Sequence, residues 1–364
     1  MSAITQNLPR VAFEEVEIAS PPLHARPIGK ARPTLSHIRI LQGIAILLVV
    51  YAHAVIPGHR FTGGLEVFDR FVRACCVPLF ICLSGFLYRY TNGGKKAAGF
   101  FLKERVLRLL VPYFCLSSLA FVVKASLGSA ASRPLPYSWA SYAHQLLYPW
   151  DNAVIFFWFI PTLTLICVVS LCIDKWLIQK RPAALFPLLA VLAALSSYAG
   201  INQITYPVRF FNLYGALNYL FYFWAGFALC RYEVRILSAF RASWKAIPLL
   251  AAAITLAIAA PNADHAMALL EASLGCLAML VITKKLAERR DWPALMEVGD
   301  LSYQIYLLSW FFQTMPILLF SHFVSSSQYA CALMSLLLGV AGPISVVYAV
   351  RRWAPFARPL IGLR

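Results

Sequence analysis

The chain has 364 residues, of which 60% are hydrophobic and only 13% are charged, and its mean hydropathy is +0.70. A water-soluble domain of this length needs far more charge to cover its surface, so the composition excludes that class. The net charge of +17 would suggest nucleic-acid binding in a soluble protein. Here the basic residues fall in short stretches between apolar runs, which is typical of membrane proteins, and we exclude nucleic acid as a partner.

Residues 1–36 contain five prolines and scattered charges but no apolar run. We predict a disordered cytoplasmic tail there, and no cleavable signal peptide, because the first long apolar core begins only after residue 37. Residues 37–350 are the predicted membrane domain. Residues 351–364 contain four arginines and are predicted to be a short, basic cytoplasmic tail.

The membrane domain is predicted to be all-α, with about ten membrane-spanning helices. Ten apolar segments are long enough, or nearly so, to cross the hydrocarbon core: 38–56, 74–90, 106–127, 153–173, 183–200, 213–230, 246–261, 265–284, 299–320 and 328–350. Connections that follow even-numbered segments are rich in Lys and Arg, whereas those after odd-numbered segments are poor in them, except the first. This alternation predicts that both ends of the chain are cytoplasmic. We expect the protein to lie in the inner (plasma) membrane.

The nine cysteines do not indicate a disulfide framework or a metal site. Their number is odd, and most of them lie inside apolar runs, where cysteine behaves as a small hydrophobic residue. No His, Cys or carboxylate cluster has the spacing of metal ligands. We therefore predict neither a bound metal nor a bound cofactor.

The first apolar segment carries a polar stripe. On a helix, Gln42 and His53 are eleven residues apart and differ by only about 20° in direction, while Arg39 lies about 40° to the other side of His53. Ionisable groups at membrane depth are costly and usually line a path or a site, so His53 is a candidate catalytic residue. The alternative is that its ring only packs against a neighbouring helix or touches headgroups.

Several stretches, taken in order, resemble the acyltransferase-3 family of membrane O-acyltransferases. They are LQGIAILLVVYAH (41–53), PLFICLSGFLY (78–88), FLKERVLRLLVPYF (101–114), FFWFIPTL (156–163) and GDLSYQIYLLSW (299–310). This chain departs from the family pattern twice. Gln42 stands where the family has an arginine eleven residues before the histidine, and Ser309 stands where it often has a second histidine.

The resemblance implies that an acyl group passes from cytoplasmic acyl-coenzyme A to a hydroxyl group, with acyl-CoA as a co-substrate. A neutral imidazole can take the proton of an incoming hydroxyl, and His53 is the only histidine inside an apolar segment. Whether it acts as base or as transient acyl carrier stays open. Arg39 and Gln42 are predicted to help hold the donor along the same stripe, since an arginine stem can reach some distance along a helix.

Arg105 and Arg108 are the other predicted donor-binding residues. They are three residues apart, and so lie on one helix face, at the cytoplasmic start of the third segment. Guanidinium groups suit the phosphates of coenzyme A. The alternative is that both are ordinary topology anchors.

Acceptor binding is predicted for Tyr137, Trp139, Trp150 and Arg209, in the connections expected to face outward. Aromatic faces with a polar edge suit sugar rings. The alternative is an interfacial aromatic belt, which membrane proteins commonly have.

The resemblance thus implies a membrane O-acetyltransferase that moves acetyl from acetyl-CoA to a sugar hydroxyl of an exopolysaccharide or another cell-envelope glycan, of the xanthan-like kind. The acceptor would be lipid-linked or polymeric, and other glycan-assembly proteins are potential partners. Transfer of succinyl or another acyl group is one alternative. A glycolipid or solute transporter and a non-catalytic subunit of a glycan-assembly machine are two others, although we find no internal repeat of the kind that transporters often have.

Overall fold

The computed structural model describes residues 33–54, 64–91, 93–128, 134–201, 206–239, 246–259, 265–323 and 328–363. The chain divides into two units, residues 1–32 and 33–364. The predicted disordered tail therefore lies almost wholly outside the described residues. All that follows concerns the second unit.

The described part of this unit is built from helices and contains no strand, which confirms the predicted all-α class. Its α-helices are α1 (Pro33–Ala54), α2 (Gly64–Tyr90), α3 (Ala98–Leu127), α4 (Trp139–Leu147), α5 (Phe159–Ile173), α6 (Leu185–Ile201), α7 (Leu213–Ala239), α8 (Ala246–Ala259), α9 (His265–Arg289), α10 (Pro293–Asp300), α11 (Ser302–Phe323) and α12 (Gln328–Trp353). Shorter turns of helix are η1 (Gly93–Lys95), η3 (Pro149–Asp151), η4 (Ile155–Trp158), η5 (Asp174–Ile178), η6 (Pro182–Ala184), η7 (Tyr206–Asn212) and η9 (Pro355–Ile361).

Each of the ten predicted apolar segments coincides with a helix, and the short helices α4 and α10 were not predicted. Among the described residues, seven helices are long and apolar enough to cross a membrane, and a shorter apolar helix covers 182–198. Helices suit this environment because they satisfy their own backbone hydrogen bonds in lipid. The count of ten and the cytoplasmic location of both ends stay predictions.

Helix α2 begins ten residues earlier than its predicted segment, and this accounts for two of the three arginines in the connection that broke the charge alternation. Arg70 and Arg73 lie within α2, where each pairs with a carboxylate one turn earlier, Glu66 and Asp69. The Arg73 Nε to Asp69 Oδ2 distance is 2.7 Å. These cations are therefore neutralised on a helix surface, and they do not act as loop charges.

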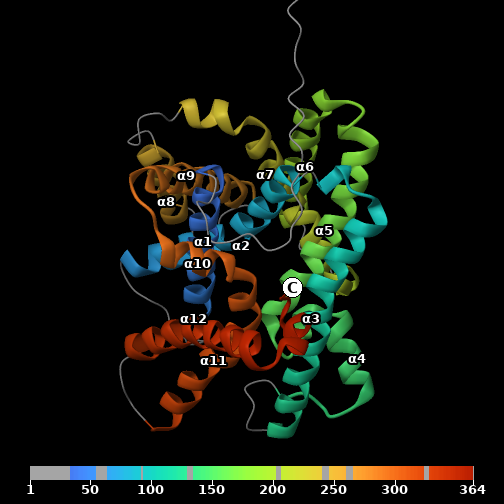
Figure 1. Ribbon diagram of the computed structural model, residues 1–364, viewed down its shortest axis with the longest axis vertical. Coiled ribbons are helices and arrows are strands. Elements are labelled where there is room, and N and C mark those ends of the chain that lie inside the picture. Colours follow the sequence, from blue (N-terminus) through green and yellow to red (C-terminus); the bar gives the residue numbers. More distant parts are fainter. Residues whose placement is uncertain are drawn as a thin grey trace, which may run out of the picture. The chain divides into compact units, whose positions relative to one another are not determined.

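Helix α1 is central to the unit, because it packs against α2, α9, α10, α11 and α12. Figure 1 shows it in blue, with the orange α9 and the red α12 beside it. Helix α2 in turn packs closely on α7. A methyl group on Gly85 would collide with the Phe223 carbonyl, and one on Gly226 would collide with the Cys82 carbonyl. Glycine is needed on both sides of this crossing, because only its missing side chain lets the two backbones approach.

The predicted basic tail after residue 350 is partly structured. Helix α12 continues to Trp353, and η9 then packs against α3 and buries Ile361. Gly362 adopts a left-handed conformation, with φ +71°, and its carbonyl accepts a 3.1 Å hydrogen bond from the buried Gln304 Nε2. A methyl group on Gly362 would collide with the Tyr303 ring, so this segment is fitted against α11.

Candidate active site

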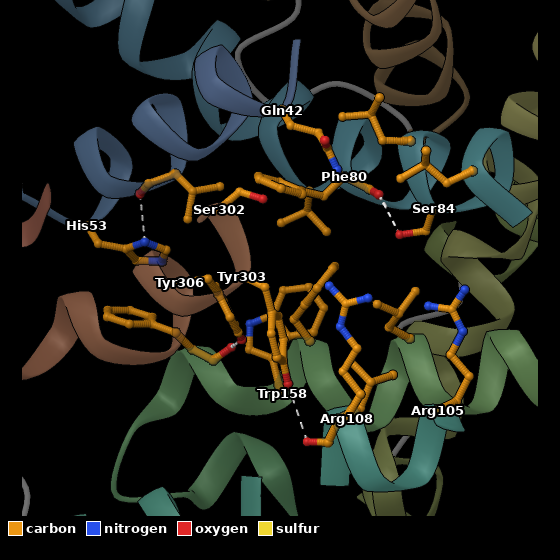
Figure 2. Close-up of a pocket in the computed structure, with 18 of the residues that line it drawn as sticks. Gln42, His53, Phe80, Ser84, Arg105, Arg108, Trp158, Ser302, Tyr303 and Tyr306 are labelled. Carbon is orange, nitrogen blue, oxygen red and sulfur yellow. Dashed lines mark hydrogen bonds between the residues drawn. The ribbon is translucent and has the colours of Figure 1, made fainter. Parts of the chain in front are cut away.

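A cavity of about 270 Å³ lies among α1, α2, α3, α11 and the segment that leads into α5 (Figure 2). Four residues singled out by the sequence line it. Gln42 and His53 come from α1, as their shared helix face would require, and Arg105 and Arg108 come from α3. Most of the other lining side chains are apolar or aromatic, among them Val49, Phe80, Leu83, Phe156, Phe159 and Leu163.

His53 is held in one orientation by its own helix. Its Nδ1 lies 2.8 Å from the Val49 carbonyl oxygen, one turn earlier. Because a carbonyl oxygen can only accept, Nδ1 must carry the hydrogen, and in the neutral ring Nε2 then carries the lone pair. The side chain is partly buried, and the structure describes no hydrogen-bond partner for Nε2. This tautomer leaves a basic nitrogen free to accept a proton.

The Phe156 ring covers one face of His53, with a centroid distance of 3.6 Å. The segment from Asn152 to Trp158, which we call the roof, carries this ring. Asn152 is buried, and its Nδ2 donates to Ser117 Oγ at 3.0 Å, while its Oδ1 accepts from the Val154 amide at 2.9 Å. A buried and well-bonded amide of this kind fixes the course of the backbone.

Further bonds fasten the roof to its neighbours. The Ala153 amide donates to Gln145 Oε1 at 3.0 Å, and its carbonyl accepts from the buried Lys124 Nζ at 3.2 Å. On the other side, the Tyr306 hydroxyl of α11 donates to the Phe156 carbonyl. The roof is therefore held by α3, α4 and α11 at once, which explains how an irregular segment can form a cavity wall.

Arg105 and Arg108 mark the other end of the cavity. They lie one turn apart on α3, Arg105 over the Phe101 ring at 5.2 Å and Arg108 over the Tyr303 ring at 5.9 Å. Arg105 is half-buried and forms no carboxylate ion pair within the described ranges. Two cations resting on aromatic rings form a site where an anion can bind without displacing an existing partner of Arg105.

Arg39 is not among the residues that line the cavity, although it lies on α1. Its guanidinium pairs with Asp300 at the end of α10, with Nε to Oδ1 at 2.8 Å and a second bond from Nη2. The predicted role of Arg39 in donor binding stays a prediction. Ser309 is buried and donates to the Tyr306 carbonyl at 3.4 Å, outside the cavity lining.

The four predicted acceptor residues fall into different places. Tyr137 and Trp139 are highly exposed and line a second cavity of about 350 Å³, between α3 and α4, together with Phe121 and Tyr142. Trp150 instead stacks on Trp158, which lines the His53 cavity. Arg209 is exposed on η7. Of these four residues, Trp150 is thus linked to the first cavity by a ring contact.

Comparison with known families gives one match. A family model described as an acyltransferase domain, of the acyltransferase-3 type, matches residues 36–349. The chain belongs to the acyltransferase-3 family. No curated protein and no solved structure matches it.

Sequence reasoning missed several polar residues that line the cavity of this acyltransferase. They are Ser84, Thr91, Trp158, Ser302, Tyr303 and Tyr306. Two signals could have found some of them. Tyr303 and Tyr306 are three residues apart in the motif at 299–310 and so share a helix face, and Trp158 is the one residue with a polar ring atom in the motif at 156–163.

The arrangement suits acyl transfer by a membrane acyltransferase. One end of the cavity presents a nitrogen base, and the other end presents two guanidinium groups. Within the described residues no group of three or more His, Cys, Asp or Glu side chains could hold a metal ion. The chemistry that these side chains can supply is proton transfer at one end and anion binding at the other.

Proposed function

We propose that this acyltransferase moves an acetyl group from cytoplasmic acetyl-CoA to a sugar hydroxyl of an exopolysaccharide or another cell-envelope glycan, in the inner (plasma) membrane. The observation that carries the proposal is the single cavity that contains both His53 and the Arg105–Arg108 pair. An acyl-CoA donor needs both features at separate places in one cavity, because its thioester reacts near a base and its phosphate groups bind to cations.

The reaction follows from the free Nε2 of His53. The acceptor oxygen forms a bond to the thioester carbonyl carbon, while its proton passes to Nε2. The tetrahedral intermediate then breaks its carbon–sulfur bond, and the departing thiolate takes the proton back from the imidazolium. The free ring is thereby restored to the tautomer that the Val49 carbonyl favours.

The donor would lie with its nucleotide end at Arg105 and Arg108, because guanidinium groups form charge-assisted hydrogen bonds with phosphate. Its acyl end would reach into the apolar part of the cavity. The cavity of about 270 Å³ has room for the thioester end and a short acyl group.

The acceptor would approach from the side of the roof, where Trp150 stacks on Trp158. Tyr137 and Trp139, around the second cavity, would contact a more distant part of the glycan. Aromatic rings with exposed faces are suited to sugar rings. A lipid-linked or polymeric glycan is long enough to contact both places.

The test compares wild type, His53→Ala and His144→Ala, expressed at matched levels in cells that lack the protein. His144 is the matched control, because it pairs with Asp151 at 3.0 Å and does not line the cavity. NMR of the glycan measures its O-acyl content and identifies the acyl group. We expect wild type and His144→Ala to restore acylation, and His53→Ala to reduce the rate by about 10²- to 10⁴-fold.

Two outcomes would contradict the proposal. Equal acylation by wild type and His53→Ala would exclude His53 as the base. No acylation by wild type, with the protein present in the membrane, would favour a transporter or a non-catalytic subunit.

A further inference from the structure

Acyl transfer develops negative charge on the thioester carbonyl oxygen, and an enzyme gains most by placing a hydrogen-bond donor there. Most hydroxyl groups around the cavity already use their hydrogen. Ser84 donates to Phe80 O at 2.9 Å, and Thr91 donates to Leu87 O at 2.8 Å. Tyr303 and Tyr306 also donate to main-chain carbonyls. These oxygens can accept hydrogen bonds, but they have no hydrogen to offer while these bonds persist.

Trp158 differs from them. It lines the cavity, its indole is a pure donor, and the described residues supply no hydrogen-bond acceptor for its Nε1. It lies two residues beyond Phe156, whose ring touches His53. In the view of Figure 2, the indole nitrogen lies on the side of the ring nearer His53. The side-chain amide of Gln42 is also a donor in the cavity lining, but Gln42 is about 16 Å along α1 from His53, too far to serve the same reacting group.

Two aromatic rings clamp the Trp158 ring. Trp150 stacks on it with centroids 4.9 Å apart and planes 9° apart, and Tyr219 stacks on it at 5.7 Å and 22°. The Trp158 carbonyl accepts a 2.7 Å bond from Thr162 Oγ1. These contacts hold the orientation of the indole before a ligand binds, and preorganisation of this kind is what a transition-state donor requires.

Asn212 organises this clamp. It is fully buried, its Oδ1 accepts from Trp150 Nε1 at 2.9 Å, and its Nδ2 donates to Thr162 Oγ1 at 2.6 Å. Asn212 and Phe211 both have positive φ, 56° and 50°, the only such non-glycine residues in the described ranges. Strained backbone of this kind persists only where surrounding structure enforces it, and it clusters at functional sites.

We propose that the Trp158 indole N–H stabilises the oxyanion of the tetrahedral intermediate, and that Asn212 is the positioning residue that holds the Trp150–Trp158 pair. The inference rests on the proposed function and adds a catalytic residue to it. When the acceptor oxygen bonds to the carbonyl carbon, the π electron pair moves onto the carbonyl oxygen, which accepts a hydrogen bond from Nε1. When the carbon–sulfur bond breaks, the carbonyl re-forms and that bond weakens. No proton leaves the indole.

The test uses the full chain purified in nanodiscs, with acetyl-CoA as donor and, as acceptor, the cell's own glycan stripped of O-acyl groups by mild alkali. Trp158→Phe keeps an aromatic ring that can stack on Trp150 and Tyr219 but removes the donor. We expect kcat to fall by about 10²- to 10³-fold, the typical cost of losing one oxyanion donor, with the KM for acetyl-CoA changed less than about threefold.

Trp224→Phe is the matched control. Trp224 is fully buried in α7, does not line the cavity, and has an indole nitrogen without a hydrogen-bond partner. Its replacement makes the same chemical change elsewhere in the bundle, and we expect kcat to stay at the wild-type value.

Two further variants separate the donor from packing. Benzothienylalanine at position 158, introduced by codon expansion, keeps the shape of the indole and replaces its N–H with sulfur, so it should reproduce the kcat loss with an unchanged unfolding temperature. Asn212→Leu should raise the KM for the glycan and lower kcat together, because the clamp loosens while His53 stays in place.

The outcomes distinguish this inference from the proposed function. A kcat within about threefold of wild type for the benzothienylalanine protein, while His53→Ala is inactive, would overturn the role of Trp158 alone and turn attention to Ser302. Loss of activity in Trp158→Phe with retention in the benzothienylalanine protein would show that only packing matters. An active His53→Ala would contradict the proposed function instead.

Discussion

At the His53 end of the cavity, side chains are fastened to the main chain: His53 to Val49 O, Tyr306 to Phe156 O, and the roof to α3 and α4. At the opposite end, Arg105 and Arg108 rest over aromatic rings, and Arg108 is exposed. Bond-making needs atoms held within a narrow range of positions, whereas charged groups can recognise phosphates from several positions. The two ends are therefore expected to control different kinetic constants.

Apart from the His53 and Trp158 replacements described above, the largest effect is expected at the arginine end. Arg105→Ala combined with Arg108→Ala should raise the KM for acetyl-CoA by about 10- to 100-fold, because each hydrogen bond to a charged group contributes about 1.5–3 kcal/mol and partial exposure weakens it. The value of kcat should change little. Steady-state kinetics on the purified protein measures both constants.

Two controls sharpen that result. Replacement of both arginines by lysine keeps the charge but loses the planar fork, and should give an intermediate KM. Arg352→Ala removes an exposed arginine of α12 that does not line the cavity, and should leave the KM unchanged. A wild-type KM in the double alanine variant would mean that Arg105 and Arg108 serve only as topology anchors.

A smaller effect is expected from Tyr306→Phe, at the His53 end. The change removes the hydroxyl that holds the Phe156 carbonyl and loosens the roof over His53. A loss of about 1 kcal/mol of transition-state stabilisation corresponds to roughly a fivefold lower kcat, without a change in the KM for acetyl-CoA. Tyr348→Phe is the control, since that hydroxyl donates to Glu297 away from the cavity. A raised donor KM in Tyr306→Phe would remove the distinction between the two ends.

The smallest effect is expected for the Arg39–Asp300 ion pair, which lies outside both ends. The two side chains are 30% and 49% exposed, so either Arg39→Gln or Asp300→Asn should cost only about 0.2–1 kcal/mol of stability. Thermal unfolding and donor kinetics on both variants test this. A raised donor KM in Arg39→Gln alone would support the predicted role of Arg39 in binding the donor.

Much of the fold could be predicted from the sequence, because apolar runs of membrane-spanning length have few structures open to them. Each predicted segment coincides with a helix, although α2 and α3 begin earlier than expected. The parts of these helices that precede the predicted segments carry charges, such as Glu66 and Lys103, which a search for apolar runs places outside the helix. The short helices α4 and α10 do not cross a membrane and so carry no such signal.

The candidate site was only partly predictable. Periodicity on one helix places Gln42 and His53 on the same face, and both line the cavity. Periodicity cannot reveal partners distant in the chain, such as Asp300 for Arg39 or Phe156 for His53. Trp158 and Asn212 owe their positions to an irregular segment and to two residues of positive φ, which hydrophobic patterns do not specify.

The left-handed Gly362 bears on how the orientation of this protein can be mapped. Its backbone lies against the Tyr303 ring, and Tyr303 and Arg108 both border the arginine end of the cavity. A reporter enzyme or fluorescent protein joined directly behind residue 363 would therefore start next to the arginine end, where the nucleotide end of the coenzyme is proposed to bind. Such a fusion would lower turnover by crowding this end of the cavity, and the lost activity would say nothing about which side of the membrane the reporter occupies.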